Sequence, residues 1–126
     1  MNTQNPRYNR KQKGNAGEEA AVQYLISQSY EIVERNWRCR SGEIDIIAMN
    51  SGSLVFVEVR SRSRGILQGT AEESVTASKI RQVRSVAEFY LYTKHQTDTS
   101  ITFDVITVIL DNDLSVLSLN HIKEAF

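Results

Sequence analysis

Residues 43–60 read Glu-Ile-Asp-Ile-Ile-Ala-Met-Asn-Ser-Gly-Ser-Leu-Val-Phe-Val-Glu-Val-Arg, and this stretch decides the fold. Two apolar runs, at 44–49 and 54–59, flank the polar residues 50–53. Asn, Ser and Gly are the residue types that form tight reversals between strands. The stretch therefore predicts a β-hairpin at the centre of the fold.

The length of the hairpin loop determines which side chains meet across the two strands. A loop of two or four residues places Asp45 opposite Glu58 and Glu43 opposite Arg60, whereas three or five would break this register. Two facing carboxylates repel each other, and burying an unpaired one costs on the order of several kcal/mol. Three compensations are open: a divalent cation held by both acids, protonation of one acid, or a lysine or arginine from elsewhere. Arg60 lies two residues beyond Glu58 and is expected on the same face.

Length and composition are those of a single-domain protein, for which we expect a cytoplasmic location. The chain has 126 residues, of which 40% are hydrophobic and 24% charged. No apolar run approaches the roughly 20 residues of a membrane helix, so we expect no membrane partner. The N-terminus lacks the apolar segment of a secretion signal, and the lone Cys39 has no partner for an intramolecular disulfide.

Charge is distributed unevenly along the chain, although the formal net charge is zero. Residues 1–84 hold 13 of the 15 Lys and Arg but only 9 of the 15 acids, so a basic face for phosphates remains open. Residues 1–13 contain four basic residues and no acid. We interpret them as a flexible arm that either touches a polyanion or keeps the terminus soluble, followed by one domain at 14–126.

The first helix is expected from Asn15 to about residue 27, because small and apolar residues recur there at helical spacing. Asn15 is a suitable N-cap. Glu18 follows three residues later, where a capping-box carboxylate turns back to the N-cap amide. Spacing alone therefore favours a structural role for Glu18.

The remaining elements complete an α/β fold. The strand at 54–59 is apolar except at Glu58, which indicates burial on both faces and therefore helices on both sides. A helix between it and a later strand makes these two strands parallel. The other predicted elements are a strand at 30–37, a helix at 76–94, a strand at 101–110, an edge strand at 114–119 and a terminal helical turn at 121–126. The prediction is a three-layer α/β sandwich with a mixed central β-sheet.

Several charged and aromatic residues admit two interpretations. Trp37 either fills the core, which we favour, or offers a stacking surface for nucleic acid. Asp104, inside a strand, either joins the acids of the hairpin or, as we favour, binds a neighbouring backbone group or arginine. Basic residues in the first turns of the helix at 76–94 oppose the helix dipole, which indicates either a second role or a solvated face. Residues 61–65 are expected to leave the sheet as a polar segment that opens a loop extending to Gly69.

An acid on the first helix, an Asp and a Glu on a hairpin, and a cation two residues further on are typical of metal-dependent phosphodiesterases. Magnesium takes oxygen ligands and keeps several waters, so two or three carboxylates hold it and leave positions for phosphate and water. The residues at these positions also match a known family. The matching segments are Gly17-Glu18 with Ala21 and Tyr24-Leu25, Asn36-Trp37-Arg38, Gly42-Glu-Ile-Asp45, Leu54-Val-Phe-Val-Glu-Val59, Phe103-Asp104-Val105 and His121-Ile122.

Over residues 14–126 the chain resembles the bacterial YraN-like family, which is similar to the PD-(D/E)XK nucleases and, within them, to archaeal Holliday-junction resolvases. The resemblance implies a restriction-endonuclease-like fold, DNA as partner, and a homodimer. It implies that Asp45, Glu58 and Glu18 bind Mg²⁺ (or Mn²⁺), that Arg60 takes the position of the motif lysine, and that Gln82 lies near the site.

The departure at residue 60 leaves more than one function open, because an arginine is permanently charged and does not act as a base. The first hypothesis is a metal-dependent endonuclease that hydrolyses phosphodiester bonds in branched or damaged DNA. The alternative is a catalytically inactive nucleic-acid-binding module with the same fold. The third is an interaction protein whose acids are paired with basic side chains.

Overall fold

The computed structural model describes residues 7–64 and 75–126, which form two helices and a five-stranded sheet. The strands lie in the order β1-β2-β3-β4-β5. In chain order the elements are α1 (Arg10–Ser27), β1 (Glu31–Cys39), β2 (Gly42–Asn50), β3 (Ser53–Ser63), α2 (Ala77–Thr93), β4 (Ser100–Leu110) and β5 (Val116–Ile122).

The β2–β3 hairpin has the two-residue loop on which the predicted register depends. Ser51 and Gly52 both have positive φ, 52° and 83°, as a type I′ turn requires, and glycine adopts this conformation without strain. The antiparallel pairing runs from Asn50 opposite Ser53 to Ile46 opposite Val57. The predicted register is confirmed over this ladder, and one further step places Asp45 opposite Glu58.

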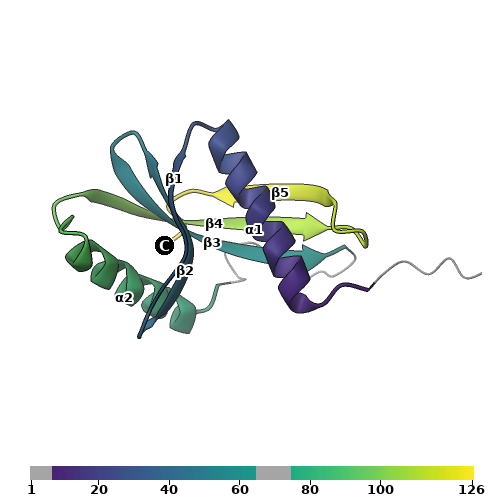
Figure 1. Ribbon diagram of the computed structural model, residues 1–126, viewed down its shortest axis with the longest axis horizontal. Helices are drawn as coiled ribbons and strands as arrows, with labels where there is room; N and C mark the ends of the chain where they lie inside the picture. The colour runs from purple at the N-terminus through teal and green to yellow at the C-terminus, as the bar shows by residue number, and fades with distance from the viewer. Residues whose placement is uncertain (1–6, 65–74) are drawn as a thin grey trace, which may run out of the picture.

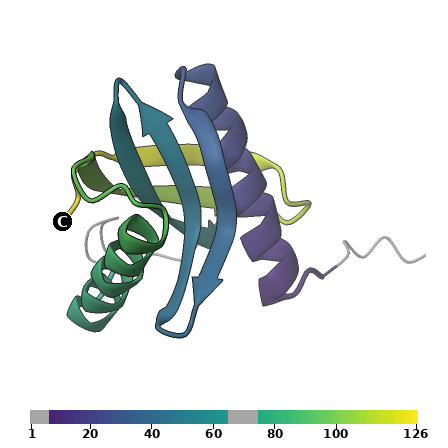
Figure 2. The ribbon, with the colours of Figure 1, turned by 60° about the vertical axis from the view of Figure 1, so that its left-hand side comes forward.

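The two helices cover opposite faces of a mixed sheet. β3 and β4 are parallel and joined through α2, whereas the other neighbouring strands are antiparallel. Figures 1 and 2 show the sheet between α1 and α2. The predicted three-layer α/β sandwich is therefore confirmed. Neither helix in the described ranges is long and apolar enough to cross a bilayer.

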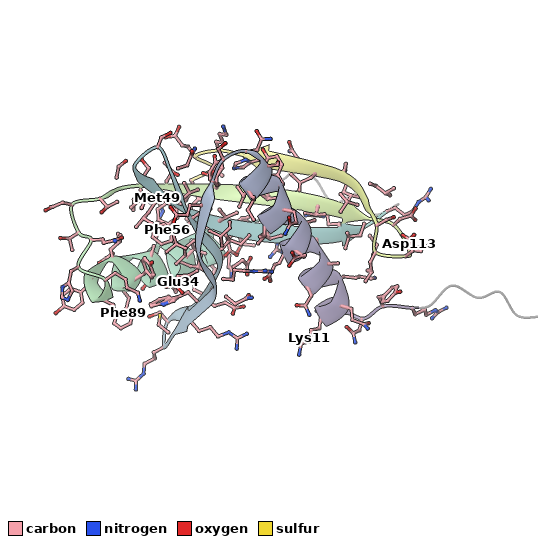
Figure 3. All side chains as sticks on the ribbon, turned by 45° about the horizontal axis from the view of Figure 1, so that its top comes forward. Lys11, Glu34, Met49, Phe56, Phe89 and Asp113 are labelled. Atoms are coloured by element: carbon pink, nitrogen blue, oxygen red, sulfur yellow. The ribbon has the colours of Figure 1, made fainter. Side chains whose placement is uncertain are left out.

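Each helix seals its own hydrophobic core against the sheet. The core under α1 includes Leu25, Ile46 and Val57, and the core under α2 includes Phe56 and Tyr90. Figure 3 shows Phe56 inside the molecule and Phe89 on the outer side of α2. Both clusters draw on β2 and β3, which explains the nearly continuous apolar sequence of these two strands.

Trp37 packs against the core under α2, with its ring centroid 5.1 Å from that of Tyr90. The favoured interpretation of this residue as a core residue is confirmed.

Helix α1 begins earlier than the sequence indicated. Asn9 is the N-cap, and it forms a reciprocal capping box with Gln12: each side chain bonds the other residue's amide at 2.8 Å. The predicted start at Asn15, with Glu18 as its capping-box acid, is wrong because Asn9 and Gln12 supply the same motif six residues upstream. Residues 10–13, assigned to the arm, are helical, and residues 1–6 lie outside the described part.

The end of the chain also differs from prediction. β5 spans Val116–Ile122, later than the expected 114–119, and the predicted helical turn at 121–126 is wrong. β3 continues to Ser63, pairing with Leu110, so residues 61–63 belong to the sheet instead of leaving it. The expected loop beyond Arg64 lies outside the described residues.

Gly17 lets helix α1 approach strand β3 closely. A Cβ atom built on Gly17 would lie 1.8 Å from Oγ and 2.9 Å from Cβ of Ser61. The hydroxyl could rotate away, but the Ser61 Cβ is fixed to its strand. Any side chain at residue 17 must therefore move the helix, and Glu18 with it, away from the sheet.

We predict that Gly17→Ala lowers the free energy of unfolding by roughly 1–3 kcal/mol, the usual cost of overpacking, despite the higher helix propensity of alanine. Gly14→Ala is the matched control on the same helix. No atom lies within 4 Å of its Cβ position, so it should stabilise the protein by about 0.5–1 kcal/mol. Urea unfolding of both variants measures the difference.

Removing the obstructing side chain tests the cause. In a double-mutant cycle, Ser61→Gly should cancel most of the loss from Gly17→Ala, because the nearest remaining Ser61 atom, its Cα, lies 3.8 Å from the added Cβ. Additive losses from the two substitutions would show that the contact is not the reason.

Candidate active site

Asp45 lies where the regular alternation of β2 ends. Ile46 packs in the core under α1, but both Ile44 and Ile47 pack under α2, although Ile44 and Ile46 would share a face in a regular strand. In β1 the facing position is Asn36, whose φ of 51° is left-handed. The Oδ2 of Asp45 accepts a hydrogen bond of 2.8 Å from the Val59 amide of β3. The Asp45 side chain thus takes the place of a backbone ladder bond where the β2–β3 pairing ends.

Glu58 is a buried carboxylate with one satisfied and one unsatisfied oxygen. Only 2% of the residue is exposed. Its Oε1 lies 3.4 Å from Nζ of Lys79, whereas Oε2 is buried without any hydrogen-bond partner. Burial and the negative charge of Asp45 raise the pKa of Glu58 to about 7, against the weaker opposing charge of Lys79. The predicted convergence of the two acids is therefore present.

Asp45 shares the same electrostatic environment. Burial raises its pKa, and the Val59 hydrogen bond and the charge of Lys79 oppose that rise. Of the three compensations that the sequence left open, the structure contains the basic side chain from elsewhere, Lys79 of α2. The elevated pKa of Glu58 also lets protonation contribute near neutral pH.

Glu18 approaches the pair from helix α1. Burial raises its pKa first and the charge of Asp45 second, while a side-chain hydrogen bond from Asn36 lowers it. Asn36 therefore links the irregular point of β1 to the helical acid. The structure thus brings Glu18 beside Asp45, a placement that the resemblance implied and the capping interpretation did not.

Arg60, the arginine predicted beside the acids, does not pair with them in the described part of the chain. Arg60 is exposed, and among the influences on the pKa of Glu58, where burial dominates, its charge is weaker than that of Lys79. Glu43 does not pair with Arg60; its carboxylate binds Nε of Arg38 at 2.7 Å across β1 and β2. That part of the expected charge pairing is wrong, because the facing strand β1 supplies a nearer arginine.

Gln82 contacts Lys79 and the start of β2. Its Oε1 accepts from Lys79 Nζ at 3.3 Å, and its Nε2 donates to the Ser41 carbonyl at 3.2 Å. The side chain packs over Gly42, where an added Cβ would lie 2.7 Å from Nε2. Gln82 is therefore near the acids, as the resemblance implied, through its contact with Lys79.

A cleft of about 500 Å³ opens beside these acids. Two acids and four basic side chains line it, together with three residues of other types. The lining residues are Arg10, Lys13, Gly14, Glu18, Asp45, Val59, Arg60, Ser61 and Arg62. Helix α1 contributes its first turns to one wall, and Figure 3 shows Lys11 projecting outward from this end of the helix. A concave basic surface above carboxylates is suited to an anionic ligand that binds together with a cation.

The carboxylates at the site include donors of the kind that a magnesium ion requires. Asp45 and Glu58 fit, since they are hard oxygen donors and Oε2 of Glu58 is buried without a partner. Among residues 7–64 and 75–126, no three His, Cys, Asp or Glu side chains are grouped closely enough to hold a metal. The structure therefore offers a metal two carboxylates, those of Asp45 and Glu58. Glu18 as a third ligand stays a prediction.

A second buried polar cluster lies between β4, β5 and α1. Asp104 accepts from the Glu124 amide at 3.0 Å, and its other oxygen lies 2.7 Å from Nε2 of His121. Nδ1 of His121 is 3.0 Å from the hydroxyl of Tyr24. Asp104 thus has the structural role that we favoured, with His121 and a backbone amide as partners in place of an arginine. Nothing local in the sequence indicated the partner of His121.

Comparison with known proteins places the chain in a family. The model of "Uncharacterised protein family UPF0102" matches residues 17–108. The chain belongs to the UPF0102 family. A UPF0102 protein of Desulforamulus reducens is 48% identical over 92% of this chain and 96% of its own length. One of Caldicellulosiruptor saccharolyticus is 41% identical over 94% of this chain and 99% of its own.

A solved chain from an EndoMS–dsDNA2 complex is similar to this UPF0102 chain over 87% of its length, with a TM-score of 0.44 and 10% identity. The match spans 39% of that solved chain.

We predict that Glu58 makes this UPF0102 protein less stable as pH rises. The folded-state pKa of about 7 exceeds the ordinary value of 4.5, so the folded state binds more protons between these values. The free energy of unfolding should therefore fall by about 1.4 kcal/mol per pH unit as the pH increases from about 4.5 to 7. Above pH 7 it should level off. Glu58→Gln should remove this dependence. Urea unfolding at pH 5 and pH 8 in EDTA measures it.

The control is Glu88→Gln, which removes an exposed carboxylate from α2. Its stability difference from the wild type should be the same at both pH values. The Glu58 interpretation is wrong if Glu58→Gln also differs from the wild type by a constant amount.

Proposed function

We propose that the chain is a metal-dependent endonuclease that hydrolyses phosphodiester bonds in DNA, with branched and damaged duplexes as the substrates to test first. The observation that carries the proposal is the unpartnered, buried Oε2 of Glu58 beside Asp45, next to a cleft lined by basic side chains. A buried acid pair of this kind is costly to stability unless it binds a cation. The resemblance to PD-(D/E)XK nucleases agrees with this assignment.

Asp45 and Glu58 would hold Mg²⁺ or Mn²⁺. Such an ion would polarise a phosphate oxygen and lower the pKa of a bound water. Asp45 is fixed by the Val59 amide, so its carboxylate is already oriented before a ligand arrives. Glu18, which is close to Asp45 and hydrogen-bonded to Asn36, would hold a proton or orient a water at the same point.

The basic side chains would bind and orient the DNA backbone. Arg10 and Lys13 project from the first turns of α1, and Arg60 and Arg62 from β3, around one cleft. Phosphate contacts of this type position a duplex without reading its sequence. Arg60 keeps its charge at any relevant pH, so it can stabilise negative charge that develops on phosphate but does not remove a proton.

The runner-up is an inactive nucleic-acid-binding module. Arg60 at the position of the motif lysine favours it, because a group that could activate water is absent from that position. This second function requires the same basic cleft and no hydrolysis.

We predict that the wild type cuts branched DNA with Mg²⁺ or Mn²⁺, and that Asp45→Asn slows cleavage on the order of 100-fold or more while DNA affinity changes little. The variant keeps the size of the side chain but loses the charge that holds a metal. Asp113→Asn, in the exposed β4–β5 turn, is the control and should cut normally. Single-turnover cleavage and a binding titration in EDTA separate the two effects.

Arg60→Lys decides between the two functions. If neither the wild type nor Arg60→Lys cuts linear, branched or single-stranded DNA or RNA with either metal, the binding module replaces the nuclease. Cleavage by Arg60→Lys alone would show that the fold is competent and that residue 60 limits the chemistry.

We also predict that Arg10→Gln and Lys13→Gln each weaken DNA binding similarly for all sequences. Each should reduce the slope of log affinity against log salt by about one, because one phosphate contact and its released counterion are lost. Lys94→Gln is the control, since Lys94 is the C-cap of α2, pairs with Glu34 and does not line the cleft. Fluorescence anisotropy at several salt concentrations gives the slopes. An unchanged slope for both cleft variants would place the DNA elsewhere.

A further inference from the structure

Lys79 occupies an unusual position for a cation. It lies in the first turn of α2, where its own amide donates to the N-cap hydroxyl of Thr76 at 3.1 Å. The positive end of the helix dipole disfavours a lysine there. Glu58 compensates, since its Oε1 lies 3.4 Å from the Lys79 ammonium.

The ammonium of Lys79 is held in place from two sides. It binds Glu58 and also donates to Oε1 of Gln82, whose amide is oriented by its other bond, to the Ser41 carbonyl. Only 29% of the Lys79 side chain is exposed. An ammonium with two fixed acceptors and little solvent is an ordered part of the site and not a solvated surface charge.

Arg60 does not take this place. Within residues 7–64 and 75–126, Lys79 is the only Lys or Arg in an ion pair with Glu58, and Arg60 forms no ion pair. Arg60 lines the cleft and comes from β3, whereas Lys79 reaches Glu58 from the first turn of α2. The two cations therefore come from different elements.

We propose that Lys79 is the built-in counter-ion of the acid pair and competes electrostatically with the divalent cation for it. This inference rests on the proposed function, because it concerns the metal that function requires. Before metal binds, Lys79 is a positioning residue whose ammonium holds Oε1 of Glu58. A dication brought to Asp45 and Glu58 meets the repulsion of this fixed ammonium, so the site binds metal more weakly than its two carboxylates alone would.

The test measures metal affinity without DNA or turnover. Calorimetric titration with Mn²⁺ and Mg²⁺ at pH 8.5 compares the wild type with Lys79→Met, Lys79→Arg and Arg81→Met. Lys79→Met should bind metal about tenfold more tightly, since one nearby positive charge is gone. Lys79→Arg should retain the wild-type affinity. Arg81→Met removes an exposed charge from the same helix and should change affinity far less.

Stability in EDTA supplies a second readout. Lys79→Met should unfold at lower temperature than the wild type in EDTA, because Glu58 has lost its counter-ion. Saturating metal should then raise the unfolding temperature of Lys79→Met more than that of the wild type. If Lys79→Met does not fold, Lys79→Gln makes the same change of charge and still offers Glu58 a donor.

Equal or weaker metal binding by Lys79→Met overturns the inference, and so does a failure of both proteins to bind metal. Metal binding by Lys79→Met alone supports it in its strongest form, in which Lys79 excludes the ion, and counts against the nuclease. The nuclease proposal is judged separately by cleavage, so the two failures are distinguishable.

Discussion

The constraint on which this site depends is that Asp45 and Glu58 occupy facing positions of adjoining strands. The two-residue loop at Ser51 and Gly52 fixes the register up to Ile46 opposite Val57, and the next residue along each strand is one of the two acids. Burial raises the pKa values of both, and the charge of Asp45 raises that of Glu58 further. The fold retains the pair at a cost to stability, which is expected where a ligand, and not the fold, benefits from the charge.

Local irregularities bring other elements to these acids. Gly17 removes the side chain that would separate α1 from Ser61, and Glu18 follows it. Asn36 takes a left-handed conformation that asparagine tolerates, and its side chain reaches Glu18. Gly42, with φ of 141°, leaves room for Gln82. Each of these three features lies next to a candidate site residue. Irregularities also occur elsewhere in the sheet, since the β1–β2 pairing shifts between Ile32 and Glu34 and the β4–β5 pairing shifts between Ile109 and Leu110.

The sequence predicted what depends on local pattern and missed what depends on distant partners. Periodicity and turn residues sufficed for the element order, the parallel β3–β4 pair and the hairpin register. The capping box was misplaced because Asn9 with Gln12 and Asn15 with Glu18 offer the same spacing, and only the structure selects between them. The pairs Lys79–Glu58 and His121–Asp104 join different elements, and a single sequence carries no signal for them. His121 belongs to β5 and not to a helical turn, since it pairs with Ile106 of β4.

The two cations that flank the acids differ in the chemistry they can perform. Arginine presents a rigid, permanently charged fork, which suits phosphate on the open side of the cleft, where Arg60 lies. Lysine is a compact charge on a flexible stem, which suits a partly buried position where it must yield to another cation. Lys79 holds that position, so arginine at residue 60 does not leave the acids without a lysine. In the proposed function, arginine at residue 60 would serve phosphate binding and Lys79 would serve charge balance, two tasks that a single lysine beside the acids would have to combine.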